Sequence, residues 1–153
     1  GAVLAAIRVA PTRDRVLEAL LSAATTHARQ AFCFRVRDGR LEGMDSAGSS
    51  LGAAAVRRII LPLSSSSTFH RVIVEGQPHF GPLGLGATDQ VLRVAIGSRG
   101  GRVSMHGLWI DSRPIGLLVA DDVRTGQVGH ERLGAHAVGD VTGRHDDATD
   151  VGS

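Results

Sequence analysis

The segment from Val103 to Asp122 constrains the fold more than any other part of the sequence, because it predicts a buried β-hairpin. Two apolar runs, within residues 103–111 and 114–119, lie on either side of a short polar turn. The segment holds no pair of nucleophile and base, no cluster of metal ligands and no phosphate loop. It therefore predicts an architecture and not a chemical activity.

The second half of this hairpin is almost continuously apolar, which is typical of a strand covered on both faces. Because successive side chains of a strand point to opposite faces, we expect Leu117 and Val119 on one face and Leu118 on the other. Layers of structure are therefore expected on both sides of the sheet.

Periodicity and turn residues predict the other elements. In chain order they are a helix over 13–29 capped by Thr12, strands over 31–36 and 40–44 around an Asp38-Gly39 turn, a loop or short helix over 45–55, and a strand over 56–61. They continue with a helix over 68–74 capped by one of the serines 64–67, a brief strand at 79–80, a helix over 89–96 capped by Thr88, the hairpin, and a glycine-weakened helix over 130–141. This order predicts an α+β fold, with a central, mostly antiparallel sheet of five or six strands and flanking helices.

One domain is expected over residues 12–143, after an N-terminal extension over 1–11 and before a flexible tail over 144–153. No apolar run approaches the ~20 residues that span a bilayer, and residues 2–7 lack the basic flank of a signal peptide. We therefore expect a cytoplasmic protein with no membrane partner.

The basic residues exclude several function classes, because all 17 are Arg and the chain has no Lys. Phosphate loops of the Walker type and lysine Schiff bases are therefore excluded. The arginines are scattered and the formal net charge is only +2, which argues against a nucleic-acid partner. The one cysteine, Cys33, excludes an internal disulfide and a zinc site built on several cysteines.

Three strings resemble catalytic or metal-binding motifs, but their contexts disagree with those motifs. The string from Gly48 to Gly52 has the G-x-S-x-G pattern, yet polar residues 45–47 precede it where a nucleophile elbow needs a buried strand. After His130-Glu131, Gly134 stands where a zinc protease has its second His. The aspartates 146, 147 and 150 lack the spacing of a calcium loop. No catalytic residue and no metal site is predicted.

Cys33 lies between Phe32 and Phe34, so on a strand its side chain faces away from both phenylalanines. We expect a buried structural thiol, because a reactive thiol needs an electropositive and partly exposed setting. Trp109, in the middle of a predicted strand, is expected to pack in the core.

The chain resembles the GAF domain, a cytoplasmic sensory module related to PAS domains. The resemblance rests on residues 32–36 before the turn at 38–39, on Ile59 to Leu63 before a short helix, and on the hairpin with its Ile-Gly-Leu-Leu-Val strand. It implies a ligand pocket between the sheet and the short helices, lined by Phe69, His70, Ile73, His79 and Phe80. No cofactor is implied, because the residues that bind cyclic nucleotide or bilin in some GAF domains have no recognisable counterparts.

The first helix carries a wide apolar stripe that includes Leu17 and Leu21, and GAF-like domains often pair through such helices. A homodimer with these two leucines at the contact is therefore expected. The predicted function is a non-enzymatic sensory or protein-interaction domain whose partner is another protein, a second copy or a small molecule. Two alternatives remain: a small assembly module that dimerises like roadblock-type proteins, and a small enzyme that uses Cys33 or the serine-rich loop.

Overall fold

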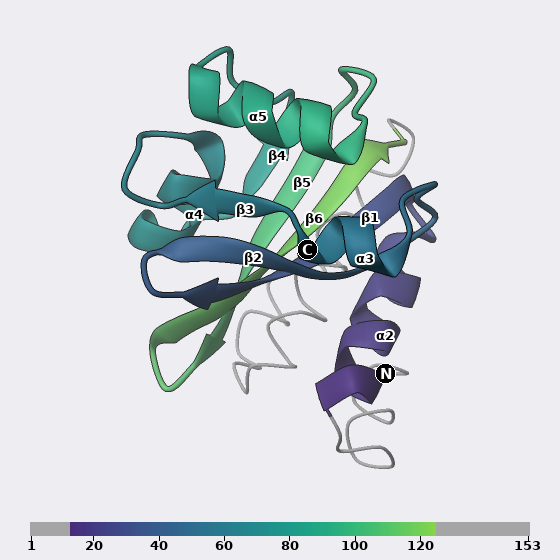
Figure 1. The fold of residues 1–153 in the computed structure, drawn as a ribbon, viewed down its shortest axis with the longest axis horizontal. Helices are drawn as coiled ribbons and strands as arrows, with labels where there is room; N and C mark the ends of the chain where they lie inside the picture. Colours follow the sequence, from purple (N-terminus) through teal and green to yellow (C-terminus); the bar gives the residue numbers. More distant parts are fainter. Residues whose placement is uncertain (1–12, 125–153) are drawn as a thin grey trace, which may run out of the picture.

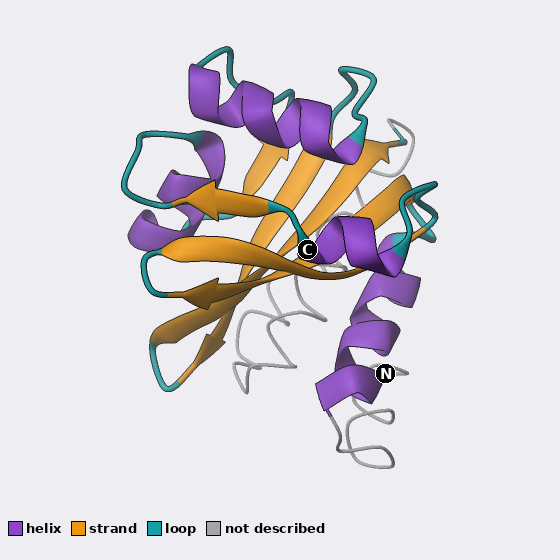
Figure 2. Ribbon diagram, in the orientation of Figure 1, coloured by secondary structure: helices purple, strands orange, loops and turns teal. Residues whose placement is uncertain are grey.

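The structure is a computed structural model that describes residues 13–124, and these residues form an α+β fold around one six-stranded antiparallel sheet (Figures 1 and 2). The strands are β1 (Ala28–Arg37), β2 (Arg40–Ala47), β3 (Ile60–Pro62), β4 (His79–Gly81), β5 (Val103–Ile110) and β6 (Arg113–Val123). The helices are α2 (Arg13–Ala24), α3 (Ala53–Arg57), α4 (Thr68–Glu75) and α5 (Ala87–Ile96). The predicted extension, tail and helix 130–141 lie outside the described residues.

The strand order is β3-β2-β1-β6-β5-β4, so β1 and β6 lie at the centre of the sheet. Two predicted hairpins, β1–β2 and β5–β6, supply four of these strands. Their turns are formed by Asp38-Gly39 and by Asp111-Ser112, and all four residues have the positive φ that tight hairpin turns require. The predicted fold class and both hairpins are confirmed.

Helices cover both faces of the sheet, as Figure 2 shows. Leu117 and Val119 belong to the main core, together with residues from α3, α4 and α5. Leu118 belongs to a second cluster on the opposite face, which is covered by α2. The predicted alternation along β6 is therefore confirmed. Burial on both faces explains why the second half of the hairpin is apolar at successive positions.

The short helix α3 lies directly on β2 because one position in that strand has no side chain. A Cβ atom on Gly43 would collide with the backbone carbonyl of Val56 in α3. The Gly43 backbone N–H donates to the carbonyl oxygen of Ile59, with an N···O distance of 2.9 Å, just after α3 ends. Glycine at this position therefore allows α3 and its Val56 side chain to close one end of the main core.

The caps of α4 follow the sequence prediction. The Ser67 hydroxyl accepts a hydrogen bond from the backbone N–H of His70, and Gly76 ends the helix in the left-handed conformation. The N-cap of α5 is Gly86, so the prediction that Thr88 caps this helix was wrong. Thr88 lies inside the first turn, because the helix begins two residues earlier than its apolar periodicity indicates.

Three predicted boundaries were also wrong, each because long-range pairing outweighs local composition. The first helix ends at Ala24 and not at residue 29, since Ala28 already pairs with Val123 in the sheet. Residues 45–47, predicted as loop, extend β2 because they pair with β1. In the strand predicted over 56–61, Val56 is helical and only residues 60–61 are extended.

Among residues 13–124, none of the helices has the length and apolar character that spanning a membrane requires.

Candidate functional site

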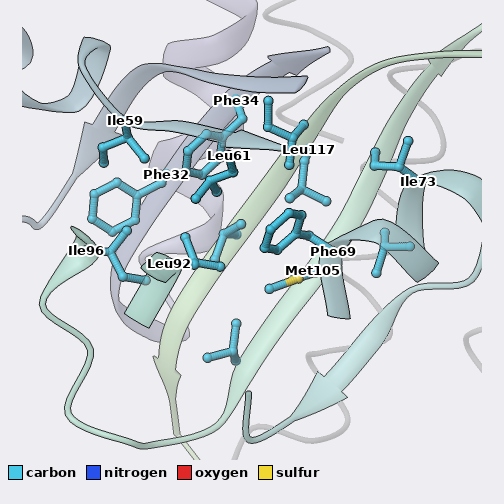
Figure 3. Packing of buried hydrophobic residues seen from close by; sticks show 14 of the residues in the cluster. Phe32, Phe34, Ile59, Leu61, Phe69, Ile73, Leu92, Ile96, Met105 and Leu117 are labelled. Carbon is cyan, nitrogen blue, oxygen red and sulfur yellow. The ribbon is translucent and has the colours of Figure 1, made fainter. Parts of the chain in front are cut away.

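Two of the five predicted ligand-binding residues form part of the main core. Phe69 and Ile73, on successive turns of α4, are buried against the sheet together with Leu92 of α5, Met105 of β5 and Leu117 of β6. Figure 3 shows these side chains filling the space between the helices and the sheet. A molecule bound at this position would therefore have to displace α4 or α5 from the sheet.

The other three predicted residues lie nearer the surface. The half-buried His70 donates from Nδ1 to the carbonyl oxygen of Leu63 at 2.6 Å. His79 donates from Nε2 to the carbonyl oxygens of Gly81 and Pro82, at 3.2 and 3.1 Å. Both imidazoles therefore hold neighbouring loops in place. The Phe80 ring is partly exposed, and the guanidinium carbon of Arg102 lies 5.7 Å from its centroid, within cation–π range.

The N-terminal turns of α4 and α5 are joined by a buried polar contact that sequence reasoning missed. The Asp89 carboxylate accepts hydrogen bonds from the backbone N–H and from the hydroxyl of Thr68, both at 2.9 Å. The Thr68 hydroxyl also accepts from the backbone N–H of Gly84, at 3.4 Å. The first backbone N–H of α4 is therefore already satisfied by a carboxylate of this chain.

A half-open groove of about 720 Å³ lies between α2, the β1–β2 hairpin and α3. It is lined by Asp14, Arg15, Leu17, Glu18, Arg35, Gly43, Met44, Asp45 and Arg57. These residues come from four separate elements, so no local motif in the sequence announces the groove. Three carboxylates and three guanidinium groups balance in charge around Leu17 and Met44. This composition suits a polar or zwitterionic surface more than an apolar ligand.

Ion pairs fix one wall of this groove. The Arg35 guanidinium donates to Glu42 at 2.9 Å, and Arg40 donates to the other carboxylate oxygen of Glu42 at 3.1 Å. These hydrogen bonds, that from Arg35 above all, hold the pKa of Glu42 below its usual value. Arg35 is thereby positioned by its partner on the neighbouring strand.

Cys33 is fully buried on the face of the sheet covered by α2, opposite to Phe32 and Phe34. Removal from water, together with a smaller effect of the nearby negative charge of Asp45, raises the pKa of its thiol to about 12. The predicted buried thiol is confirmed. At neutral pH the sulfur stays protonated, so it is a poor nucleophile.

The serines offer little to a nucleophilic mechanism. Ser50, in the G-x-S-x-G string, is exposed, and no histidine among residues 13–124 hydrogen-bonds to it. Ser104 Oγ lies 2.9 Å from His106 Nε2 on β5, so the prediction that the segment from Val103 to Asp122 holds no pair of nucleophile and base was wrong. Ser104 is, however, only 3% exposed. Burial at that level prevents a substrate from reaching the hydroxyl. Residues 13–124 also contain no cluster of three side chains that could hold a metal ion.

The two predicted dimer-contact residues have different surroundings. Leu21 is 2% exposed and packs into the cluster beneath α2, together with Ala31, Cys33 and Leu118. Leu17, one turn earlier, is half-buried and lines the groove. Leu17 is therefore the more accessible of the two to a partner, while Leu21 attaches the helix to its own sheet.

Trp109 is also less buried than its position in a strand predicts. The register of β5 with β6 is irregular between Leu108 and Trp109, and the indole ring lies over Gly107, where a Cβ atom would meet the indole nitrogen. The side chain is half-buried and is not part of the main core. The prediction that Trp109 packs in the core was therefore wrong.

The sequence matches no family model and no curated protein. Among solved structures it is similar to the GAF domain of a phosphoenolpyruvate-protein phosphotransferase from Coxiella burnetii, with a TM-score of 0.67, 14% identity, and coverage of 97% of this chain and 93% of that one. A methyl-accepting chemotaxis protein, residues 122 to 287, matches with a TM-score of 0.65, 12% identity, and coverage of 97% and 96%. The GAF domain of the cyanobacteriochrome TePixJ matches with a TM-score of 0.61, 13% identity, and coverage of 88% and 91%. The order of elements, the paired hairpins and these similarities together establish that the chain has a GAF-like fold.

Proposed function

We propose that this chain is a non-enzymatic sensory or regulatory domain that acts through a bound small molecule, a protein partner or a second copy of itself. The observation that carries the proposal is the similarity in fold, over nearly the whole of both chains, to the chemotaxis protein and the GAF domains described above. Two of those three structures are GAF domains, which favours this function over a roadblock-type assembly module.

A ligand site between the sheet and the short helices remains part of the proposal. Phe69 and Ile73 occupy that space, so the ligand enters only when α4 or α5 moves away from the sheet. The ligand is expected to be largely apolar, because the side chains that it would contact are apolar and Asp89 already satisfies the first N–H of α4.

Self-association through α2 is also part of the proposal. Leu17 and Met44 are half-buried apolar side chains in a groove whose acidic and basic groups balance. Such a surface is suited to a two-fold contact, in which the carboxylates of one copy face the guanidinium groups of the other. A cytoplasmic location completes the proposal, and fractionation of cells that express the protein tests it.

Native mass spectrometry of the freshly purified protein tests the central claim. We expect a dimer of the 16.0 kDa chain, a small molecule released on denaturation, or both. A bare monomer at high micromolar concentration would contradict both the bound small molecule and the second copy, and would leave a different protein as the partner. Assays with panels of ester and peroxide substrates test the non-enzymatic part. Turnover that is lost in the Cys33→Ala or Ser50→Ala variant would establish an enzyme instead.

A further inference from the structure

A buried carboxylate joins the end of α5 to the two central strands. Asp121 of β6 is fully buried (0% exposed), and its carboxylate oxygens accept three hydrogen bonds from side chains. The donors are Gln30 Nε2 at 2.7 Å, Ser98 Oγ at 2.8 Å and Arg29 Nη2 at 3.2 Å. Gln30 and Arg29 belong to β1, and Ser98 lies just after α5. Three segments of the chain therefore meet at one charged group.

The same side chains also bind the backbone at the end of α5. Gln30 Nε2 donates to the carbonyl oxygen of Ile96 at 3.0 Å, and Arg29 Nη2 donates to that of Gly97 at 3.4 Å. The helix end is thus attached at three successive residues, 96 to 98. Because Gln30 and Asp121 are both buried, water cannot easily replace a contact that is broken here.

The cluster lies where the chain enters and leaves the sheet. β1 begins at Ala28, shortly after α2 ends, and β6 ends at Val123. The next residue, Arg124, donates from its backbone N–H to the carbonyl of His27 at 3.0 Å, and from its side chain to that of Thr26 at 2.9 Å. Arg29 links the cluster to this junction, since it also donates to Asp122 at 3.2 Å. The entry and exit segments are therefore in direct contact beside the end of α5.

We propose that Asp121 couples the position of α5 to the junction between α2, the start of β1 and the end of β6. When α5 moves away from the sheet, Ser98 and the Ile96 carbonyl separate from Asp121 and Gln30. The alternative to a shift of the strand ends is a buried carboxylate that has lost one of its three donors and a buried Gln30 amide that has lost its backbone acceptor, which is unfavourable. A movement of α5 is thereby transmitted to the segments before β1 and after β6, through which the domain connects to the rest of its chain. The inference deepens the proposed sensory function, but it does not depend on the identity of a ligand.

Hydrogen exchange of the whole chain, followed by mass spectrometry, tests this coupling without a ligand. Leu92→Ala loosens α5, because Leu92 is fully buried beneath that helix. Ile73→Ala is the matched control: it removes as many carbon atoms from α4, over the same face of the sheet, but the hydrogen bonds of the cluster go to β1, β6 and the end of α5 and not to α4. The two variants are compared under conditions equally far from each variant's own global unfolding midpoint. We then expect Leu92→Ala to accelerate exchange in residues 28–31 and 120–123 about tenfold more than Ile73→Ala does.

A second comparison identifies Asp121 as the coupling group. In an Asp121→Asn background, Leu92→Ala is expected to lose its additional effect on residues 28–31. The milder Ser98→Ala variant, which removes one of the three donors, gives the same comparison if Asp121→Asn does not fold. The proposal is overturned if Leu92→Ala and Ile73→Ala accelerate exchange equally. It is also overturned if the additional effect of Leu92→Ala persists in both the Asp121→Asn and the Ser98→Ala backgrounds. A released ligand in native mass spectrometry together with such a result would leave the sensory function standing and remove only this coupling.

Discussion

Thr68 donates both its backbone N–H and its hydroxyl to the carboxylate of Asp89, with both donor–acceptor distances at 2.9 Å. This pair joins the N-terminal turns of α4 and α5, the two helices that cover the proposed ligand region. Asp89 also lies in the first turn of its own helix, where a negative charge is favourable. The relative position of the two helices therefore depends on one buried carboxylate.

Replacing Asp89 by Ala leaves the Thr68 N–H and hydroxyl without that acceptor in a buried position. We expect the free energy of unfolding to fall by about 2–3 kcal/mol, measured by urea denaturation. Asp89→Asn, which keeps one carbonyl acceptor, is expected to lose less. An Asp89→Ala variant as stable as the wild type would show that the pair does not hold the helices together.

Shortening Leu117 tests the burial of the face of β6 that belongs to the main core. Leu117 is fully buried in the main core, so Leu117→Ala should cost about 2–5 kcal/mol of unfolding free energy. Ile115, on the same strand, is 44% exposed and gives the control, with an expected loss of less than about 1 kcal/mol for Ile115→Ala. Equal losses in the two variants would mean that β6 is not covered as described.

Alkylation of Cys33 measures how well α2 protects the second face of the sheet. In the native protein at neutral pH we expect a thiol reagent to react far more slowly than with the chain in denaturant, because the thiol is buried and protonated. The rate is followed by mass spectrometry of the intact protein. A native rate equal to the denatured rate would contradict the burial of Cys33 and reopen a redox function.

The same thiol predicts how stability depends on alkaline pH. The unfolded chain ionises Cys33 near pH 9.0, whereas the folded chain keeps the proton to about pH 12. The contribution of the neutral thiol is therefore fully present below pH 9.0 and is lost as the pH rises toward 12, by at most about 1.4 kcal/mol per unit. The chain has no Lys and no Tyr, so few other groups titrate in this range. A Cys33→Ala variant should lose this component of the pH dependence, and an unchanged profile would refute its source.

Introducing a charged side chain at Leu17 or at Leu21 of α2 distinguishes a role in dimer assembly from a role in folding. Leu17 lines the groove, so Leu17→Asp is expected to leave the domain folded by circular dichroism and to shift it to monomer in sedimentation velocity. Leu21 is buried beneath the helix, so Leu21→Asp is expected to destabilise the fold itself. A dimer that persists in the folded Leu17→Asp variant would remove α2 from the interface.

Much of the fold could be predicted because its signals are local. The alternation of Phe32, Cys33 and Phe34 assigns each side chain to a face of β1, and the structure confirms that assignment. The Asp38-Gly39 turn sets the register of the first hairpin, since two residues with positive φ suffice to close it. Ser67 and Gly76 similarly mark the ends of α4 by their own hydrogen-bonding and conformational preferences.

The ends of other elements were decided by partners far along the chain. Helical periodicity continues past Ala24, but Ala28 pairs with Val123, and that pairing ends α2 earlier than the local pattern indicates. The candidate site shows the same limit. Phe69 and Ile73 have the apolar character expected of a pocket wall, yet only packing against Met105 and Leu117 places them in a filled core.

The sequence by itself determined the α+β class, the two hairpins and the face on which Cys33 lies, because strand alternation and turn chemistry act over a few residues. Only the tertiary structure decided the groove beside α2 and the cluster around Asp121. Gln30 and Asp121 are 91 positions apart, and nothing local to either residue specifies the other. They meet because β1 and β6 pair at the centre of the sheet, which places a buried carboxylate and its donors side by side.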